Sequence, residues 1–243
     1  MKKIIFIVVF LTLCSGCAVT SNFEYPAKAK SLIRFADEPI YQQKIVVTAF
    51  EDMRGDETQV GTLFWCLVPL VPFCVANYER PEEAAWMLHP VRPFQFDPAW
   101  NLAEAAVYSL RKSNLFEEVS FAFKDDLGDA DFLLEGEIIS TDYRGSVNSY
   151  GLSILGSILY LFGLPTGKSH NDLILFLQLK DVETKTILWE EKYSKTHSVT
   201  HGLYYNQFGS DIKYYSVMMQ EIMNDAIEDI NSQLQKTKFV NKK

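Results

Sequence analysis

The sequence predicts an α+β fold: a mixed, mainly antiparallel sheet with helices packed on one face, plus two apolar insertions. Two runs, 132–138 and 173–179, place buried-type apolar residues at every second position, as strands with one buried face do. The DVETKT turn then leads into 187–193, which completes a hairpin. Apolar residues at helical spacing over 219–234 indicate a long amphipathic helix.

Residues 1–16 have the pattern of an export signal. Lys2 and Lys3 precede an apolar stretch, 4–13, that is too short to span a membrane as a mature helix. Small residues follow, and then Cys17. This pattern resembles the signal peptide of bacterial lipoproteins, and the resemblance implies that Cys17 is lipidated and becomes the new N-terminus. An ordinary cleaved signal, or an uncleaved anchor, would make Cys17 incidental.

The resemblance also implies a location. Cys14 stands where that family usually has leucine, which is a departure from its pattern, but Ala18 is similar to the outer-membrane version of the sorting signal. We therefore expect a palmitate-bearing lipoprotein in the bacterial outer membrane, with its domain in the periplasm. Residues 17–40 are expected to form the lipidated N-terminus and a tether, since Pro26 and Pro39 favour extended or turn segments.

One α/β domain is expected over 41–236, followed by a basic tail, 237–243. Its first strand is the β-branched run 44–50. A helix follows, with Asp97 as its N-cap and Asn114 as its end. Residues 118–123 then read as a strand, so the order of elements is strand, helix, strands, hairpin and helix.

Three segments of this domain carry a resemblance to a known group of proteins. They are IVVTAFEDMR, AVYSLRKSNLFEEV, and the DADFLLEGEI strand with LQLKDVETKTILWEEKY. Together they resemble the small α/β domain of bacterial envelope lipoproteins, namely those of curli secretion, the activators of peptidoglycan synthases and the auxiliary lipoproteins of some transporters. The resemblance covers about half of the mature chain, and it supports the fold without specifying a chemistry.

The charge balance argues against nucleic acid as a partner. The chain has 23 basic and 31 acidic residues. Removal of 1–16 takes away two lysines, which leaves 21 basic residues and a net charge near −10. Binding to nucleic acid requires a basic surface, which this composition does not provide.

Two cysteines remain in the mature chain besides the lipidated one. Cys66 and Cys74 could form a disulfide in the oxidising periplasm, or they could be buried free thiols. No histidine or second cysteine pair stands near them, so we expect no metal site, and the sequence indicates no cofactor.

Two uncharged apolar stretches, 61–76 and 151–167, are inserted in this domain. They could pack together and complete the core, or they could stay exposed and contact the membrane or a partner. The candidate contact residues are Leu63, Phe64, Trp65, Leu67, Val68, Leu70, Val71, Leu152, Ile154, Leu155, Ile158, Leu159, Tyr160, Leu161 and Phe162.

The second stretch is neither a membrane span nor a nucleotide site. As a helix it would rise about 25 Å, and a single crossing would place its two neighbouring strands on opposite sides of a membrane. A phosphate-binding loop needs four residues between its first glycine and the Gly-Lys-Ser tail, but Gly163 and Gly167 enclose three. Pro165 also removes one amide donor, so we expect no nucleotide.

No catalytic motif is visible. His197 and His201 follow a strand without the glutamate of a zinc-protease motif, so they are expected to be a surface pair. We therefore predict that the protein is not an enzyme. Its expected role is that of an interaction or assembly module whose apolar loops meet an envelope protein, further copies of itself or the membrane. The alternatives are an enzyme of envelope polymers with a site not visible in the sequence, and a periplasmic lipid carrier.

Overall fold

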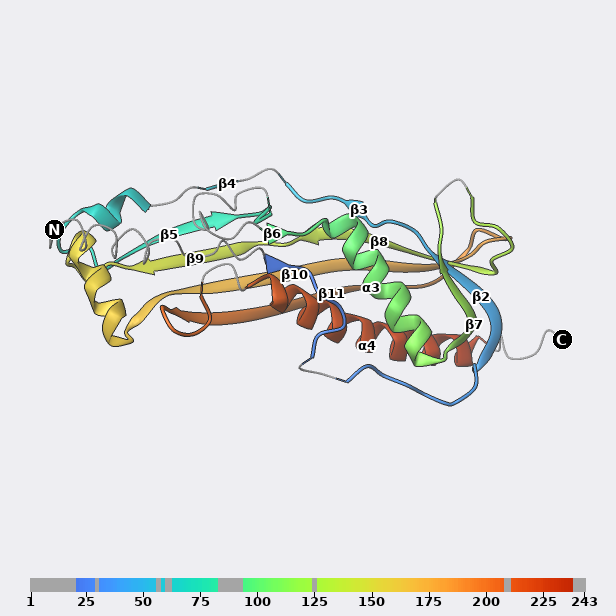
Figure 1. Ribbon diagram of the computed structural model, residues 1–243. Coiled ribbons are helices and arrows are strands. Elements are labelled where there is room, and N and C mark those ends of the chain that lie inside the picture. Colours follow the sequence, from blue (N-terminus) through green and yellow to red (C-terminus); the bar gives the residue numbers. More distant parts are fainter. Residues whose placement is uncertain are drawn as a thin grey trace, which may run out of the picture.

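The structure is a computed structural model that describes residues 21–28, 31–55, 58–59, 63–82, 94–123, 126–207 and 211–237. The expected signal peptide, the expected lipidation site Cys17 and residues 238–243 of the basic tail lie outside these ranges. Within them the chain forms one long sheet with helices on one face, which is the predicted fold class (Figure 1).

The sheet has nine strands within the described residues, and it is mixed and mainly antiparallel. The strands are β2 (Tyr41–Val47), β3 (Glu51–Asp52), β4 (Thr58–Gln59), β5 (Phe73–Tyr78), β7 (Phe116–Phe121), β8 (Phe132–Ser140), β9 (Tyr143–Asn148), β10 (Pro165–Asp181) and β11 (Ile187–Gly202). Strand β2 pairs in parallel with β7 and β8, whereas β10 pairs antiparallel with β8, β9 and β11.

Strand β10 connects two halves of the sheet. Its C-terminal half pairs with β8, from Ile174 opposite Ser140 to Asp181 opposite Phe132. Its N-terminal half pairs with β9, and β11 accompanies it along nearly its whole length. The β10–β11 hairpin therefore runs from the helix-covered body to the distal end of the molecule (Figure 1).

Helices α3 (Pro98–Ser113) and α4 (Ile212–Lys236) cover one face of the body. Helix α3 begins and ends as the sequence predicts: the Asp97 carboxylate accepts the Trp100 N–H, and Asn114 ends the helix in the left-handed region, with φ of 53°. The inward faces of both helices pack on the sheet with Leu134, Leu175 and Leu177, which are completely buried.

The expected tether over 17–40 is too long. Ser21–Asn22 already forms a strand, β1, which pairs in parallel with β6 (Phe94–Gln95). After β1, the side chains of Phe23, Tyr25 and Ile33 pack against the core. This packing removes apolar surface from water, which a flexible tether would leave exposed. From Ser21 onward, the described N-terminal residues belong to the folded body.

The apolar insertions are also more ordered than two loops. Residues 73–76 of the first belong to strand β5, which pairs with the unpredicted strand β9. Residues 165–167 of the second already belong to β10. Each insertion also contains a 3-10 helix. Helix η1 (Leu63–Leu67) precedes β5 in the first insertion, and η2 (Ser153–Phe162) precedes β10 in the second.

Candidate functional site

The two insertions lie side by side at the distal end of the sheet (Figure 1). The Leu70 N–H donates to the carbonyl oxygen of Gly151 (2.8 Å), and the Ser153 hydroxyl donates to that of Leu67 (2.7 Å). We call the surface formed by residues 63–73 and 150–164 the apolar tip.

Most candidate residues of the apolar tip are exposed. The exposed fraction is 89% for Leu70, 76% for Phe162 and 73% for Phe64. Eleven apolar side chains here have at least half of their surface exposed: Phe64, Trp65, Leu67, Leu70, Phe73, Leu152, Ile154, Leu155, Ile158, Leu161 and Phe162. Val68, Val71, Leu159 and Tyr160 are half-buried beneath them, and the Leu63 side chain lies outside the described residues. The insertions thus pack against each other without completing the core.

The tip carries no charge. Neither 58–78 nor 145–167 contains aspartate, glutamate, lysine or arginine, and the nearest charged residues along the second segment are Arg144 and Lys168. An exposed apolar surface of this extent is uncommon on a soluble domain and usually marks a contact with a protein or a membrane.

Leu70 is held in a costly conformation at the most exposed point of the tip. Its φ is 71°, in the left-handed region, which costs a residue with a β-carbon about 1–2 kcal/mol. Its side chain recovers little of this cost by burial, because almost all of its surface faces solvent. The Leu70 backbone joins the two insertions, whereas its side chain contributes little to the fold and is a candidate contact residue.

The tip is preformed by covalent and backbone constraints. A disulfide joins Cys66 to Cys74, whose Cα atoms are 5.4 Å apart, and so fixes η1 to the start of β5. The Tyr160 hydroxyl donates to the carbonyl oxygen of Asn148, which fixes η2 to the end of β9. Gly156 lies so close to the Ser149 carbonyl oxygen that a β-carbon would stand 2.0 Å from it, so only glycine fits here.

A buried polar cluster lies behind the tip. The Ser169 hydroxyl donates to Asp211 Oδ1 (2.5 Å) and lies 2.8 Å from His201 Nε2, while Asn171 Nδ2 donates to the same carboxylate (3.3 Å). All four side chains are completely buried. The expectation of a surface histidine pair is therefore wrong for His201, because this ring finds its partners inside the fold.

This cluster has the residue types of a hydrolase triad without its geometry. Both Ser169 and Asp211 face the same ring nitrogen of His201, whereas a triad places them on opposite nitrogens. The other nitrogen, Nδ1, lies 2.5 Å from the carbonyl oxygen of Asn206. Because no substrate could reach the buried serine, the cluster is structural: it holds β10, the end of β11 and the start of α4 together.

Hydrogen bonds stabilise the charged form of the Asp211 carboxylate and so lower its pKa. Burial alone would raise its pKa, but the bonds from His201, Ser169 and Asn171 outweigh burial and hold the pKa below its usual value. Sequence reasoning missed this cluster, since its members are 32 to 42 residues apart in pairs such as Ser169–His201 and Ser169–Asp211.

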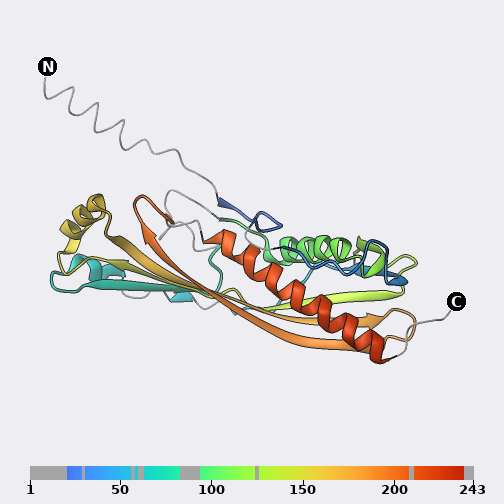
Figure 2. The same cartoon turned by 90° about the horizontal axis from the view of Figure 1, so that it is seen from below.

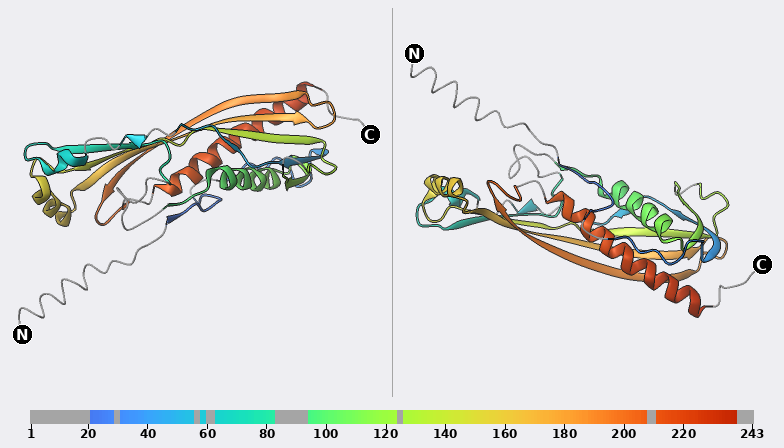
Figure 3. Two further views of the ribbon diagram at one scale, coloured as in Figure 1. Left: turned by 90° about the horizontal axis from the view of Figure 1, so that it is seen from above. Right: turned by 60° about the horizontal axis from the view of Figure 1, so that its bottom comes forward.

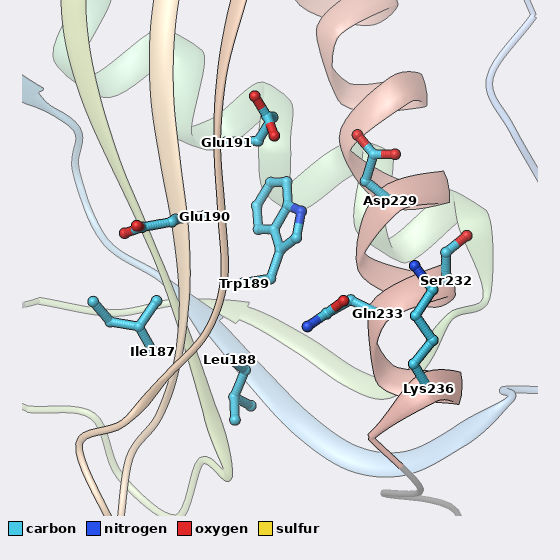
Figure 4. A pocket seen from close by; sticks show the side chains of 9 residues that line it. All are labelled: Ile187, Leu188, Trp189, Glu190, Glu191, Asp229, Ser232, Gln233 and Lys236. Carbon is cyan, nitrogen blue, oxygen red and sulfur yellow. The ribbon is translucent and has the colours of Figure 1, made fainter.

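A groove of about 570 Å³ lies on the body between β11 and α4, far from the tip. Trp189 projects into it from β11, and α4 contributes Asp229, Gln233 and Lys236 on the facing side (Figure 4). The Tyr193 hydroxyl donates to Asp229, so this carboxylate already has a partner in the fold. The groove is polar and open, and it presents neither a nucleophile motif nor an apolar cavity.

Two absences hold within the described residues. No three histidine, cysteine, aspartate or glutamate side chains there stand close enough to hold a metal ion together. Among the helices of this part of the chain, none has both the length and the apolarity of a membrane-spanning helix.

Gly167, Lys168 and Ser169 lie inside β10, so they do not form the loop before a helix that a phosphate site requires.

The chain matches no protein-family model and no curated protein. Among solved structures, it is similar to a Xanthomonas campestris protein of the DUF330 family, with 8% identity, a TM-score of 0.48, and coverage of 90% of this chain and 98% of that one. A PelC dodecamer from Paraburkholderia phytofirmans shares 11% identity, with a TM-score of 0.36 and coverage of 80% and 93%. A hemagglutinin homologue from Helicobacter pylori shares 11%, with a TM-score of 0.33 and coverage of 90% and 94%. Such low scores transfer neither function nor assembly state to this chain.

Removal of the disulfide should loosen the tip. We expect the Cys66→Ser, Cys74→Ser double variant to lose about 2–3 kcal/mol in free energy of unfolding, because the short closed loop gains freedom in the unfolded chain. Urea unfolding with and without a reducing agent measures this loss. The double variant should then be insensitive to the reductant. An equal loss on reduction of both proteins would contradict the assignment.

Asp211 should stabilise the fold above its unfolded pKa of about 3.9. Since its folded pKa is lower, this contribution is complete above that value and is lost as the pH falls through the folded pKa. Asp211→Asn should therefore unfold more easily than the parent at pH 7, and the difference should shrink below about pH 4. Urea unfolding between pH 7 and 3 tests this, with the exposed Asp126→Asn as control. A difference that does not change with pH would contradict it.

Proposed function

We propose that this chain is a lipid-anchored, non-enzymatic protein of the bacterial outer membrane, whose domain faces the periplasm and binds through the apolar tip. The signal pattern ending at Cys17 supports the anchor and the compartment. The disulfide between Cys66 and Cys74 is consistent with an oxidising compartment.

Leu70 carries the proposal of a binding role. It combines a left-handed backbone with 89% exposure, and ten further apolar side chains on the same end are at least half exposed. Single exposed apolar residues are ordinary on protein surfaces, whereas a rigid and uncharged cluster of them is a feature of binding surfaces. The tip is therefore the surface to which we assign the binding role.

The two alternative functions have less support from the geometry. An enzyme of envelope polymers would need accessible reactive groups, but Ser169, His201 and Asp211 are completely buried. A lipid carrier would need an apolar cavity, but the groove beside Trp189 is lined largely by charged and amide side chains. The tip, by contrast, offers its apolar surface outward.

The anchor predicts a specific labelling pattern. Cells grown with radioactive palmitate should label the wild-type chain, and Cys17→Ala should abolish the label because no other residue takes the lipid. Cys14→Leu, which gives the usual pattern of the lipoprotein family, should keep the label. Palmitate retained on Cys17→Ala would contradict the anchor.

The binding role predicts adducts at the tip. A photoreactive amino acid at Leu70 or Phe162 should, on irradiation of intact cells, crosslink to whatever contacts the tip, either a lipid or a protein. The same group at Glu183, in the exposed turn between β10 and β11, should give none. Mass spectrometry and gel mobility identify the adducts. An unmodified chain at both tip positions would contradict the proposed function.

A further inference from the structure

We propose that the occupant of the apolar tip is a phospholipid surface, into which the tip inserts side by side with the N-terminal acyl anchor. This inference rests on the binding role proposed above and names the partner of that surface. It is carried by the chemistry of the tip, its place at one end of the molecule, its aromatic residues and the position of the anchor.

The chemistry of the tip suits insertion by apolar burial. Its exposed side chains are aliphatic and aromatic, and no charged group interrupts 58–78 or 145–167. A buried charge would oppose entry into the acyl region, and its absence removes that penalty. The chain as a whole has a net charge of −8, so attraction to anionic headgroups does not supply the binding energy.

The shape of the tip also fits a fluid surface. Helices η1 and η2 lie at one end of an elongated sheet (Figure 2), and most of their apolar side chains are exposed. A lipid surface can close around a protruding apolar end, as it does around interfacial helices whose apolar faces lie 5–10 Å deep in estimates for such proteins.

Aromatic residues with a polar group lie at the tip and beside it. Trp65 is 52% exposed, and Tyr204, which is 67% exposed, donates its hydroxyl to the carbonyl oxygen of Leu161 in η2 (3.0 Å). Tryptophan and tyrosine are enriched at the headgroup level of membrane proteins, because their rings are apolar and their N–H or O–H groups are polar. Tyr204, which is bonded to η2, would lie near that level when η2 is inserted.

The position of the anchor allows the tip and the acyl chains to meet one membrane. Cys17 precedes strand β1 by four residues, which span at most about 14 Å. Figure 2 and Figure 3 show β1 (dark blue) and η2 (yellow) displaced to the same side of the sheet, the side on which α3 (green) also lies. A single plane can therefore contact β1 and η2.

Flotation with vesicles tests the inference in a chain without the acyl anchor. The mature chain carrying Cys17→Ala is mixed with phosphatidylcholine vesicles, which have no net charge, at 100 mM and 500 mM NaCl. We expect the protein to float with the vesicles at both salt concentrations, because apolar insertion is not screened. Adding Leu70→Ser and Phe162→Ser should lower the partition coefficient at least about tenfold.

A matched control distinguishes vesicle binding by the tip from nonspecific vesicle binding by other exposed apolar side chains. Phe123→Ser and Ile187→Ser remove two other exposed apolar side chains, 68% and 50% exposed, that lie outside the tip, and this variant should float like the parent. Circular dichroism establishes that every variant is folded. Absence of flotation in the parent, or equal flotation of the tip variant, would overturn the inference.

Two further outcomes keep this inference apart from the proposed function. The parent could fail to float and form oligomers, while the tip variant stays monomeric. The occupant of the tip is then a second copy of the chain, so the lipid inference fails and the binding role stands. The same holds if photocrosslinking at Leu70 gives only protein adducts. Absence of both flotation and adducts would remove the lipid inference and the binding role together.

Discussion

The uninterrupted pairing of β10 is the constraint on which the rest of the structure depends. This strand leaves β8 at Ile174 and is already paired with β9 at Asn171, while β11 follows it on the other side. Because β11 stays paired with β10 through this change of partner, bending the hairpin there would break backbone hydrogen bonds between the two strands. One long hairpin therefore joins the body to the distal end, so a contact at the tip would also constrain the orientation of the body.

At the distal end of the sheet, the usual distribution of polar residues outside and apolar residues inside is reversed. Ser169, His201 and Asp211 are buried behind the tip, whereas leucines, isoleucines and phenylalanines face solvent at its end. Hydrogen bonds within the buried cluster offset part of the cost of burial and favour one arrangement of β10, β11 and α4, while Asn171 Oδ1 and Asp211 Oδ2 have no hydrogen-bond partner among the described residues. The exposed apolar groups have no such compensation within the described residues. The first arrangement serves the fold, and the second is the observation on which the proposed binding role rests.

The sequence predicted what depends on local pattern. Alternation predicted β8 and β10, and the cap residues Asp97 and Asn114 defined α3, because these signals need only neighbouring residues. It missed β9, where YRGSVN lacks a clear alternation and gains its pairing only from β5 and β10. It also misjudged His201, since a short spacing to His197 says nothing about Asp211, which reaches the ring through the packing of α4. The apolar insertions were visible in the sequence, but their exposure depends on which strands carry them.

With a lipidated Cys17, the tip would need no great affinity of its own. A lipidated Cys17 would hold the domain within about 14 Å of chain from the bilayer, so the tip would meet lipid at a high effective concentration rather than from free solution. Under that condition a modest insertion free energy is enough to keep the tip inserted, and its main effect is orientation rather than retention. The groove between β11 and α4 lies at the other end of the rigid sheet, so the inserted tip would also fix where that groove stands relative to the membrane.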